Sequence, residues 1–185
     1  MAVTAEAGHG QRPLVAISSC LLGERVRYDG GDKRDPFITE TLARQFRWLP
    51  LCPETAIGLG VPRAPIQLVD IDGLTHALGV RRPELDPTRA LLAFAHQQLE
   101  LLAGVDGWIC KSRSPSCGLS DTPVYDQRGD RLRSGSGLFT AVIRECLGQL
   151  PLIDERQLAD PGLREQFLYR VQQRWRARRV GEEGQ

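Results

Sequence analysis

Three of the five cysteines stand in short polar segments where their thiols could hold a metal centre. Each follows an apolar run typical of a buried strand, among Gly, Pro and Ser residues that shape loops rather than fill cores. The segments are 18–23 around Cys20, 51–54 around Cys52 and 114–118 around Cys117. Strand carboxyl ends meet at one edge of an α/β sheet, where ligands bind. Three thiolates there would bind a metal centre and leave one position free for chemistry.

The residues alone leave several interpretations of these thiols open. Three unrelated buried cysteines are one, because free cysteine is often buried. Structural zinc usually shows paired ligands such as C-x₂-C, which are absent, and neither His9 nor His96 is an obvious fourth ligand. A nucleophilic cysteine with a histidine base has no local signature here. Soft thiolates also suit an iron–sulfur cluster.

The other two cysteines are expected to pack in the core. Cys110 ends the apolar run 108–110, where a small thiol packs well. Cys146 follows Val142 by four residues and so shares its face of a predicted helix.

Apolar runs of strand length alternate with helical patterns along the chain. Strands are expected at 14–17, 48–51, 66–69, 105–110 and 152–153, helices at 36–46, 87–103, 138–147 and 161–179, and a hairpin turn at 127–130. An Asp-Pro pair opens three of these helices, which places an N-cap before a proline at the first helical position. This alternation predicts a compact, single-domain α/β fold with a mostly parallel sheet.

Length and composition are those of one ordinary globular domain. The 185 residues are 41% hydrophobic and carry a net charge of +1, which points to no particular partner. No apolar run reaches the ~18 residues of a membrane span, and residues 1–13 have no secretory pattern. The odd cysteine count favours reduced thiols or metal ligands over disulfides. We expect a cytoplasmic monomer with a disordered tail at 1–13, a catalytic domain at 14–158 and an Arg-rich helix and tail at 159–185.

Three motifs, in order, resemble the TudS-type thiouracil desulfidase family, which includes tRNA 4-thiouridine desulfidases. They are Ser19-Cys20-Leu21-Leu22-Gly23 with Val26-Arg27-Tyr28-Asp29-Gly30, then Cys52-Pro53-Glu54 with Gly58-Leu59 and Pro62-Arg63-Ala64-Pro65, then Lys111-Ser112-Arg113-Ser114-Pro115-Ser116-Cys117-Gly118. The resemblance covers about residues 14–147. In some relatives a further helical domain follows, and segment 167–175 resembles the connection into that domain. The resemblance therefore implies that this protein is either a stand-alone form or a terminal part of that lineage.

The resemblance implies a Rossmann-like three-layer fold and a 4Fe–4S cluster bound by Cys20, Cys52 and Cys117. The open iron would take the sulfur of a thiocarbonyl substrate, and water would replace that sulfur without net redox. The family's acid/base pair matches Glu54 and Ser114. From the residues alone, Glu54 is interpreted as a carboxylate in the first turn of a helix, and Ser114 as a turn residue that precedes a proline.

The resemblance leaves the substrate open between a free thiopyrimidine, a thiolated nucleoside and 4-thiouridine in tRNA. The residues expected to line or shape the pocket are Arg27, Tyr28, Asp29, Arg63 and Arg113, although a solvated loop and surface ion pairs are alternatives. A basic loop and an Arg-rich final helix favour tRNA as the substrate, and the loop carries Arg128, Arg131 and Arg133. The alternative is that these arginines form an ordinary solvated face. A non-enzymatic zinc-binding or iron–sulfur redox sensor is the rival function.

Overall fold

Four parallel strands form the first sheet of the computed structural model, which describes residues 12–183. The sheet order is β2-β1-β5-β8, with β1 at Leu14–Ser18, β2 at Arg47–Leu51, β5 at Gly107–Cys110 and β8 at Leu152–Asp154. All three pairings are parallel, so the four carboxyl ends meet at one edge. Every residue of β5 is buried, as expected for a parallel sheet covered on both faces. The predicted α/β fold with a mostly parallel sheet is confirmed.

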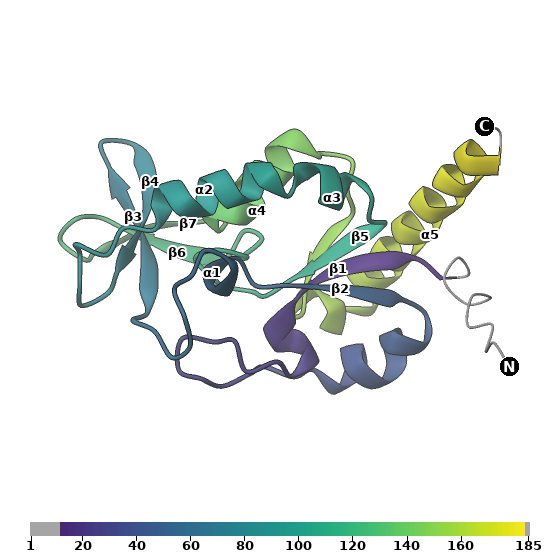
Figure 1. Ribbon diagram of the computed structural model, residues 1–185, viewed down its shortest axis with the longest axis horizontal. Helices are drawn as coiled ribbons and strands as arrows, with labels where there is room; N and C mark the ends of the chain where they lie inside the picture. The colour runs from purple at the N-terminus through teal and green to yellow at the C-terminus, as the bar shows by residue number, and fades with distance from the viewer. Residues whose placement is uncertain (1–11, 184–185) are drawn as a thin grey trace, which may run out of the picture.

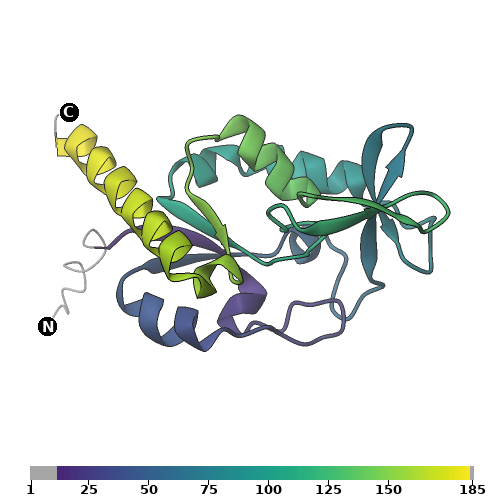
Figure 2. The ribbon, with the colours of Figure 1, turned by 180° about the vertical axis from the view of Figure 1, so that it is seen from behind.

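Helices cover both faces of this sheet and give three layers (Figure 1). One face packs against α2 (Thr88–Gln97), α3 (Leu99–Ala103) and α4 (Leu138–Cys146). On this face the rings of Trp108 and Phe139 meet edge to face, with centroids 5.3 Å apart. The other face packs against the helical segment 37–44 and α5 (Pro161–Glu183), which is seen in front in Figure 2. Alternate residues of β1 and β5 therefore enter different cores.

A second, mixed sheet lies at the far end of the molecule from the tip of α5 (Figure 1). Its order is β4-β3-β6-β7, with β3 at Ile66–Ile71, β4 at Leu74–Gly79, β6 at Thr122–Tyr125 and β7 at Arg131–Gly135. Only the β3–β6 pairing is parallel. The sequence pattern predicts a strand at 66–69 and the turn at 127–130, but it does not predict that these segments form a separate sheet.

Two predicted helices are less regular than expected. The segment predicted at 36–46 is a π-helical turn, Phe37–Thr41, followed by a 3₁₀ turn, Leu42–Arg44. Thr39 Oγ1 donates to the Asp35 carbonyl at 3.0 Å, and such side-chain bonds compete with the regular helical ladder. The helix predicted at 87–103 is divided at Gln98, whose amide is shared between two preceding carbonyls.

The amino-terminal end of the described chain is joined to the domain by a backbone hydrogen bond. The predicted tail at 1–13 lies, up to residue 11, outside the described residues, whereas Pro13 already accepts a hydrogen bond from the Arg47 amide at 2.9 Å. Within residues 12–183 no helix combines the length and the apolar character needed to cross a bilayer, since even the 23-residue α5 is rich in arginine.

Candidate active site at the carboxyl edge of the parallel sheet

The loops of Cys20, Cys52 and Cys117 all line one cavity of about 580 Å³ at the carboxyl edge of the parallel sheet. Cys20 lies in the 3₁₀ turn Ser19–Leu22, directly after β1. Cys52 follows β2 and precedes the short helix α1, Pro53–Ala56. Cys117 lies in the loop between β5 and β6. Because β1 pairs with both β2 and β5, these neighbours bring the second and third thiols to either side of the first.

Backbone contacts with the start of α4 hold the Cys117 loop in place. The Leu138 amide donates to the Pro115 carbonyl at 2.9 Å, which satisfies one of the amides that a first helical turn leaves unpaired. A Cβ atom at Gly137 would lie 2.4 Å from the Ser116 carbonyl oxygen. The close approach of helix and loop therefore requires glycine at this position.

Burial sets the chemistry of the free thiols. Cys20 and Cys117 are only 8% and 6% exposed, and Cys52 is half-buried. Burial raises the pKa of Cys20 to about 11, although the nearby Lys111 ammonium acts in the opposite direction. Burial also raises the pKa of Cys117, with a further contribution from Cys52. Protonated thiols of this kind are poor nucleophiles, whereas a bound metal compensates the charge of the thiolate form.

The arrangement of the thiols fits a group larger than one metal ion. A zinc ion with Zn–S bonds of ~2.3 Å would bring its sulfur ligands to roughly 3.8 Å from one another. Within residues 12–183, no three His, Cys, Asp or Glu side chains are grouped closely enough to hold a single ion. A cavity of about 580 Å³ has room for a cluster whose irons each take one thiolate. The donor set therefore fits an iron–sulfur cluster better than zinc.

Glu54 lines the same cavity from the first turn of α1, and both of its carboxylate oxygens are held. Arg63 Nε donates to Glu54 Oε2 and Ser116 Oγ donates to Glu54 Oε1, each at 2.9 Å. The Arg63 and Glu54 side chains are 6% and 13% exposed. Arg63 Nη1 is fixed in turn by the carbonyls of Val26 and Gly60. The carboxylate is thus held in one orientation at the cavity wall, as a general base requires.

Ser114 lines the cavity three residues before Cys117. Its hydroxyl oxygen accepts hydrogen bonds from the amides of Ser116 at 3.2 Å and Cys117 at 3.0 Å. These bonds give it the turn role that the sequence leaves open. They use only the acceptor capacity of the hydroxyl, so its hydrogen can still be donated to a ligand in the cavity.

The cavity wall includes four of the five residues expected to contact substrate, namely Arg27, Tyr28, Arg63 and Arg113. Asp29 is not among the lining residues. Its carboxylate accepts a bond from the Gly31 amide and lies 3.4 Å from Arg27 Nε, so it shapes the turn and orients Arg27. Arg63 is engaged with Glu54, which leaves Arg27 and Arg113 as the arginines that face a ligand.

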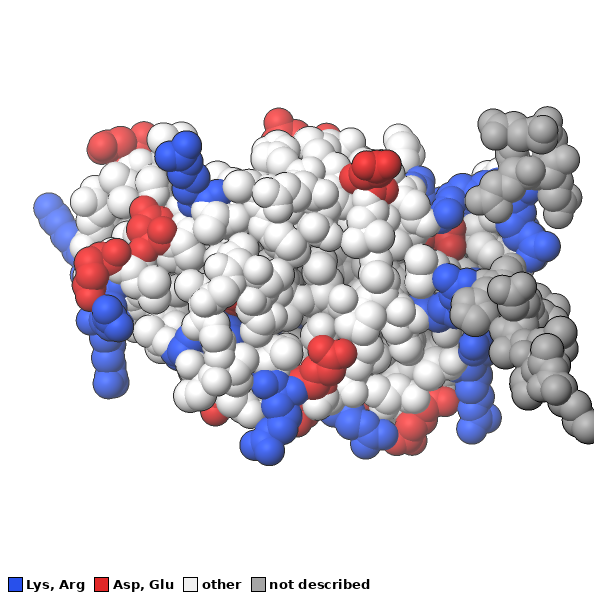
Figure 3. Space-filling model, viewed as in Figure 1, with Lys and Arg blue, Asp and Glu red and all other residues white. Residues whose placement is uncertain are grey.

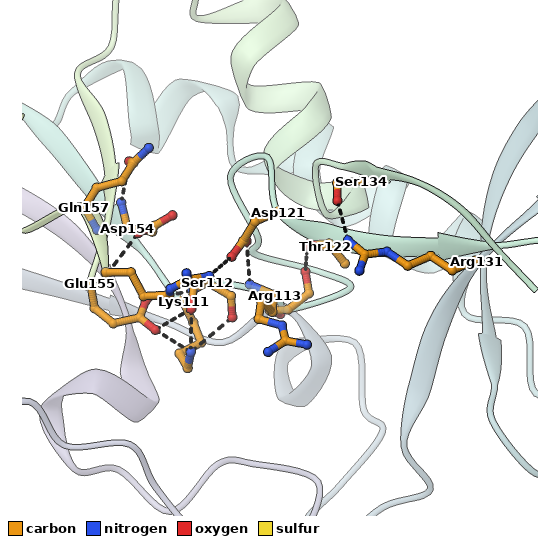
Figure 4. Close-up of polar contacts among 12 residues, drawn as sticks. Lys111, Ser112, Arg113, Asp121, Thr122, Arg131, Ser134, Asp154, Glu155 and Gln157 are labelled. Carbon is orange, nitrogen blue, oxygen red and sulfur yellow. Dashed lines mark hydrogen bonds and ion pairs between the residues drawn. The ribbon is translucent and has the colours of Figure 1, made fainter.

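The arginines expected to contact nucleic acid are Arg128, Arg131 and Arg133, and none of them lines the cavity. They lie on the β6–β7 hairpin. Arg133 Nη2 donates to Asp70 Oδ2 at 3.1 Å, which partly neutralises its charge. Arg131 Nη2 donates to Ser134 Oγ at 2.8 Å, and Figure 4 shows this side chain lying along its own strand.

At least three arginines of the Arg-rich helix α5 form hydrogen bonds within the fold, namely Arg164, Arg174 and Arg178. Arg174 Nε donates to the Val105 carbonyl at 2.9 Å, and Arg178 Nη1 lies 3.0 Å from Asp106 Oδ1. Asp106 also accepts a bond from the amide of Leu14, the first residue of β1, so Arg174 and Arg178 lie at the amino edge of the sheet, opposite the cysteines. In the view of Figure 3 the basic side chains lie at the two ends and along the lower margin, and they form no continuous basic face.

The two remaining cysteines differ from each other. Cys110 is fully buried in the core with Trp108 and Phe139, as predicted. The prediction for Cys146 is wrong, because its side chain is exposed. Val142, one turn earlier, is buried, but Cys146 is the last residue of α4, where the helix has passed the surface on which it packs.

The sequence motifs assign no role to a cluster of polar side chains at the cavity wall, formed by Lys111, Ser112 and Glu155. Lys111 and Ser112 both line the cavity, and both bond to Glu155, which follows β8 and lies 44 residues away from Lys111. Lys33 also lines the cavity. The signal available in the sequence is that the chain has 22 arginines but only two lysines, Lys33 and Lys111.

Comparison with known proteins bears on this geometry. The model of the 2-thiouracil desulfurase family matches residues 15–155, which include all three cysteine loops. The chain belongs to this family. The resemblance seen in the three cysteine motifs is thereby confirmed. A solved structure of TudS, a 4Fe-4S-dependent thiouracil desulfidase, is 30% identical, with a TM-score of 0.63 over 84% of this chain and 99% of that one. Among curated proteins, no sequence matches.

Proposed function

We propose that the protein is a desulfidase that replaces the C=S group of a thiolated pyrimidine by C=O and releases sulfide. The observation that carries this proposal is the single cavity shared by Cys20, Cys52, Cys117, Glu54 and Ser114. Membership of the 2-thiouracil desulfurase family and the likeness to TudS support the same chemistry. One water molecule supplies the oxygen and both hydrogens of the released H₂S, so the reaction consumes no electrons.

Cys20, Cys52 and Cys117 are the residues that would hold a 4Fe–4S cluster in this cavity. When bound, such a cluster supplies an iron with a free position that acts as a Lewis acid toward the sulfur of the C=S group. The protein contributes a shaped pocket in whose wall Cys20 and Cys117 are almost fully buried.

Glu54 would take a proton from the water that attacks the ring carbon. A carboxylate held by Arg63 and Ser116 needs no reorientation before it accepts that proton. The Ser114 hydroxyl would donate its free hydrogen to the pyrimidine, because its oxygen is already fixed by two amides. The C–S bond then breaks with its electron pair on sulfur, and the oxygen of the water becomes the new carbonyl oxygen.

Arg27 and Arg113 on the cavity wall favour a substrate that carries negative charge, such as 4-thiouridine in tRNA. Arg113 makes no polar contact through its guanidinium among the described residues, and a phosphate is the group for which a free guanidinium is best suited. Free thiouracil brings no such charge. We therefore place tRNA 4-thiouridine, or a thiolated nucleoside, ahead of free thiouracil.

Sulfide release by anaerobically reconstituted protein tests the function. We expect sulfide from thiouracil, 4-thiouridine or thiolated tRNA, with the matching oxo base as the second product and no added reductant. A brown, cluster-containing protein that turns over none of the three would instead indicate a redox sensor. A colourless protein that binds zinc would contradict the cofactor assignment.

The basic hairpin gives a separate prediction for tRNA. Replacing Arg128, Arg131 and Arg133 by Ser should weaken tRNA binding and make it less steeply dependent on salt, because fewer counterions are released. Activity on a free thiolated base should stay close to that of the wild type, since none of the three lines the cavity. If the triple variant binds tRNA with an unchanged salt slope, the hairpin is only a solvated edge.

A further inference from the structure

Both lysines of a chain that otherwise uses arginine line the candidate active site. A lysine ammonium is a compact charge with three donors, whereas a guanidinium is a broad planar fork. The two lysines differ in their surroundings. Lys33 is exposed and no side-chain bond fixes it among the described residues, whereas the side chain of Lys111 is only 17% exposed. Lys111 is therefore the lysine that the fold positions.

Hydrogen bonds hold the Lys111 ammonium in one place (Figure 4). Its Nζ donates to Glu155 Oε1 and to both the carbonyl oxygen and Oγ of Ser112, at 3.0 Å for each Ser112 atom. Glu155 is held in turn by the Ser112 amide at 2.7 Å and the Ser112 hydroxyl at 2.6 Å. Burial raises the pKa of Glu155, but these bonds outweigh that effect and the net shift is downward, so the carboxylate stays charged.

Lys111 lines the same cavity as the three thiols, whereas its carboxylate partner Glu155 is not among the lining residues. The Lys111 amide donates to Ser18 Oγ at 2.9 Å, which fixes Lys111 beside the end of β1 that leads into the Cys20 turn. Of the arginines on the wall, Arg63 is paired with Glu54, while Arg27, oriented by Asp29, and the exposed Arg113 remain to face a substrate. Lys111, although paired with Glu155, is thus a fixed and largely buried cation on the wall that the thiols share.

We propose that Lys111 supplies the positive charge that stabilises the sulfur leaving the substrate as hydrosulfide, with Ser112 as its positioning residue. This inference rests on the proposed function. In that reaction the C–S bond breaks with its electron pair on sulfur, water delivers oxygen to the ring carbon, and the sulfur leaves as HS⁻ with one of the water protons. Glu54, already negative in the same cavity, receives the other. An anion formed in a buried pocket beside a carboxylate requires a counter-charge, and a fixed ammonium provides one without reorganisation.

Hydrosulfide binding tests this role without any substrate. Anaerobic titration of the cluster-loaded protein with sodium sulfide, above the first pKa of hydrogen sulfide, is followed by the visible absorption of the cluster. Lys111→Met should weaken hydrosulfide binding roughly tenfold or more, because it removes a poorly screened charge. Glu155→Gln removes the opposite charge while Ser112 still holds the ammonium, so hydrosulfide should bind at least as tightly as in wild type. Arg81→Met is the control, in which an exposed, screened charge outside the cavity lining is lost and the affinity should change less than about threefold.

The two variants are expected to change hydrosulfide affinity in opposite directions, which distinguishes an electrostatic role of Lys111 from a structural one. If the ion pair only braces the loop, Lys111→Met and Glu155→Gln break the same pair and should both weaken binding, which would overturn the inference. If Lys111→Met fails to fold or to hold iron, hydrosulfide affinity is compared in Glu155→Gln and Lys111→Arg instead. Both variants keep the positive charge and should keep the affinity, so a loss of affinity in both would overturn the inference. Wild-type protein that binds no hydrosulfide would also overturn it. Wild-type protein that binds hydrosulfide but desulfurises nothing would count against the proposed function alone.

Discussion

Glu54→Gln is expected to lower the rate of sulfide release by about 10²–10⁴-fold, the usual contribution of a general base, while the iron content stays at the wild-type level. The amide has the shape of the carboxylate but cannot take a proton. Its oxygen can still accept from Arg63, and its NH₂ group can donate to the Ser116 hydroxyl, so both neighbours keep a partner. The variant therefore separates proton transfer from the structure of the wall. The measurement is initial rate per bound iron, on whichever thiolated pyrimidine the wild type desulfurises.

Glu40→Gln is the matched control for this experiment. Glu40 also forms an ion pair with an arginine, Arg34, at 3.1 Å, but the pair is exposed and lies outside the cavity lining. Its loss should leave the rate unchanged, since exposed pairs of this kind contribute little. If Glu54→Gln reduces the rate by less than about tenfold, Glu54 is a helix-start carboxylate, and another group must activate the water.

The sequence predicts the parallel sheet well because its strands are continuous apolar runs. The segments 14–17 and 105–110 correspond to β1 and β5, which are buried on both faces and so show no polar alternation. The helices α2 and α5 follow Asp-Pro pairs, which fix their starts to within a few residues. The order of these strands in the sheet, β2-β1-β5-β8, is not part of that prediction.

The second sheet is not predicted because its outer strands lack the pattern of a buried strand. Four of the five residues of β7 are exposed, and the strand consists largely of Arg, Ser and Gly. In β4 the first residue, Leu74, is apolar yet 68% exposed. Such edge strands are held by backbone pairing to β6 and β3 rather than by their own side chains. Hydrophobic periodicity therefore carries little information about them.

The sequence singles out individual residues of the candidate site, but it does not predict which of them contact one another. Cys20, Cys52, Cys117 and Glu54 stand out because each lies in a local motif, and the cavity brings them together. The contacts of Glu54 with Ser116 and of Lys111 with Glu155 join residues 62 and 44 positions apart. Local sequence patterns do not report such contacts, since they depend on which strands become neighbours in the sheet.

Single Ser substitutions of Cys20, Cys52 and Cys117 should each remove most of the bound iron and all measurable desulfurisation. A hydroxyl is a much poorer ligand for iron than a thiolate, and three ligands leave no spare thiol at the cavity wall. Iron and acid-labile sulfide per protein, with the visible absorption of the cluster, measure the effect. The loss should be the same whether the cluster is formed in cells or reconstituted, because the missing ligand is absent in both cases.

The two cysteines outside the cavity lining make the assignment testable by contrast. Cys146→Ser changes an exposed thiol, and Cys110→Ala removes a fully buried one from the apolar core. Both variants should bind iron as the wild type does, although Cys110→Ala should unfold at a lower temperature because it leaves a small cavity. This result would show that burial alone does not decide which thiols bind iron, since Cys110 is more deeply buried than Cys117. Full iron loading in Cys52→Ser, or iron loss in Cys146→Ser, would show that the three loops do not share one cluster.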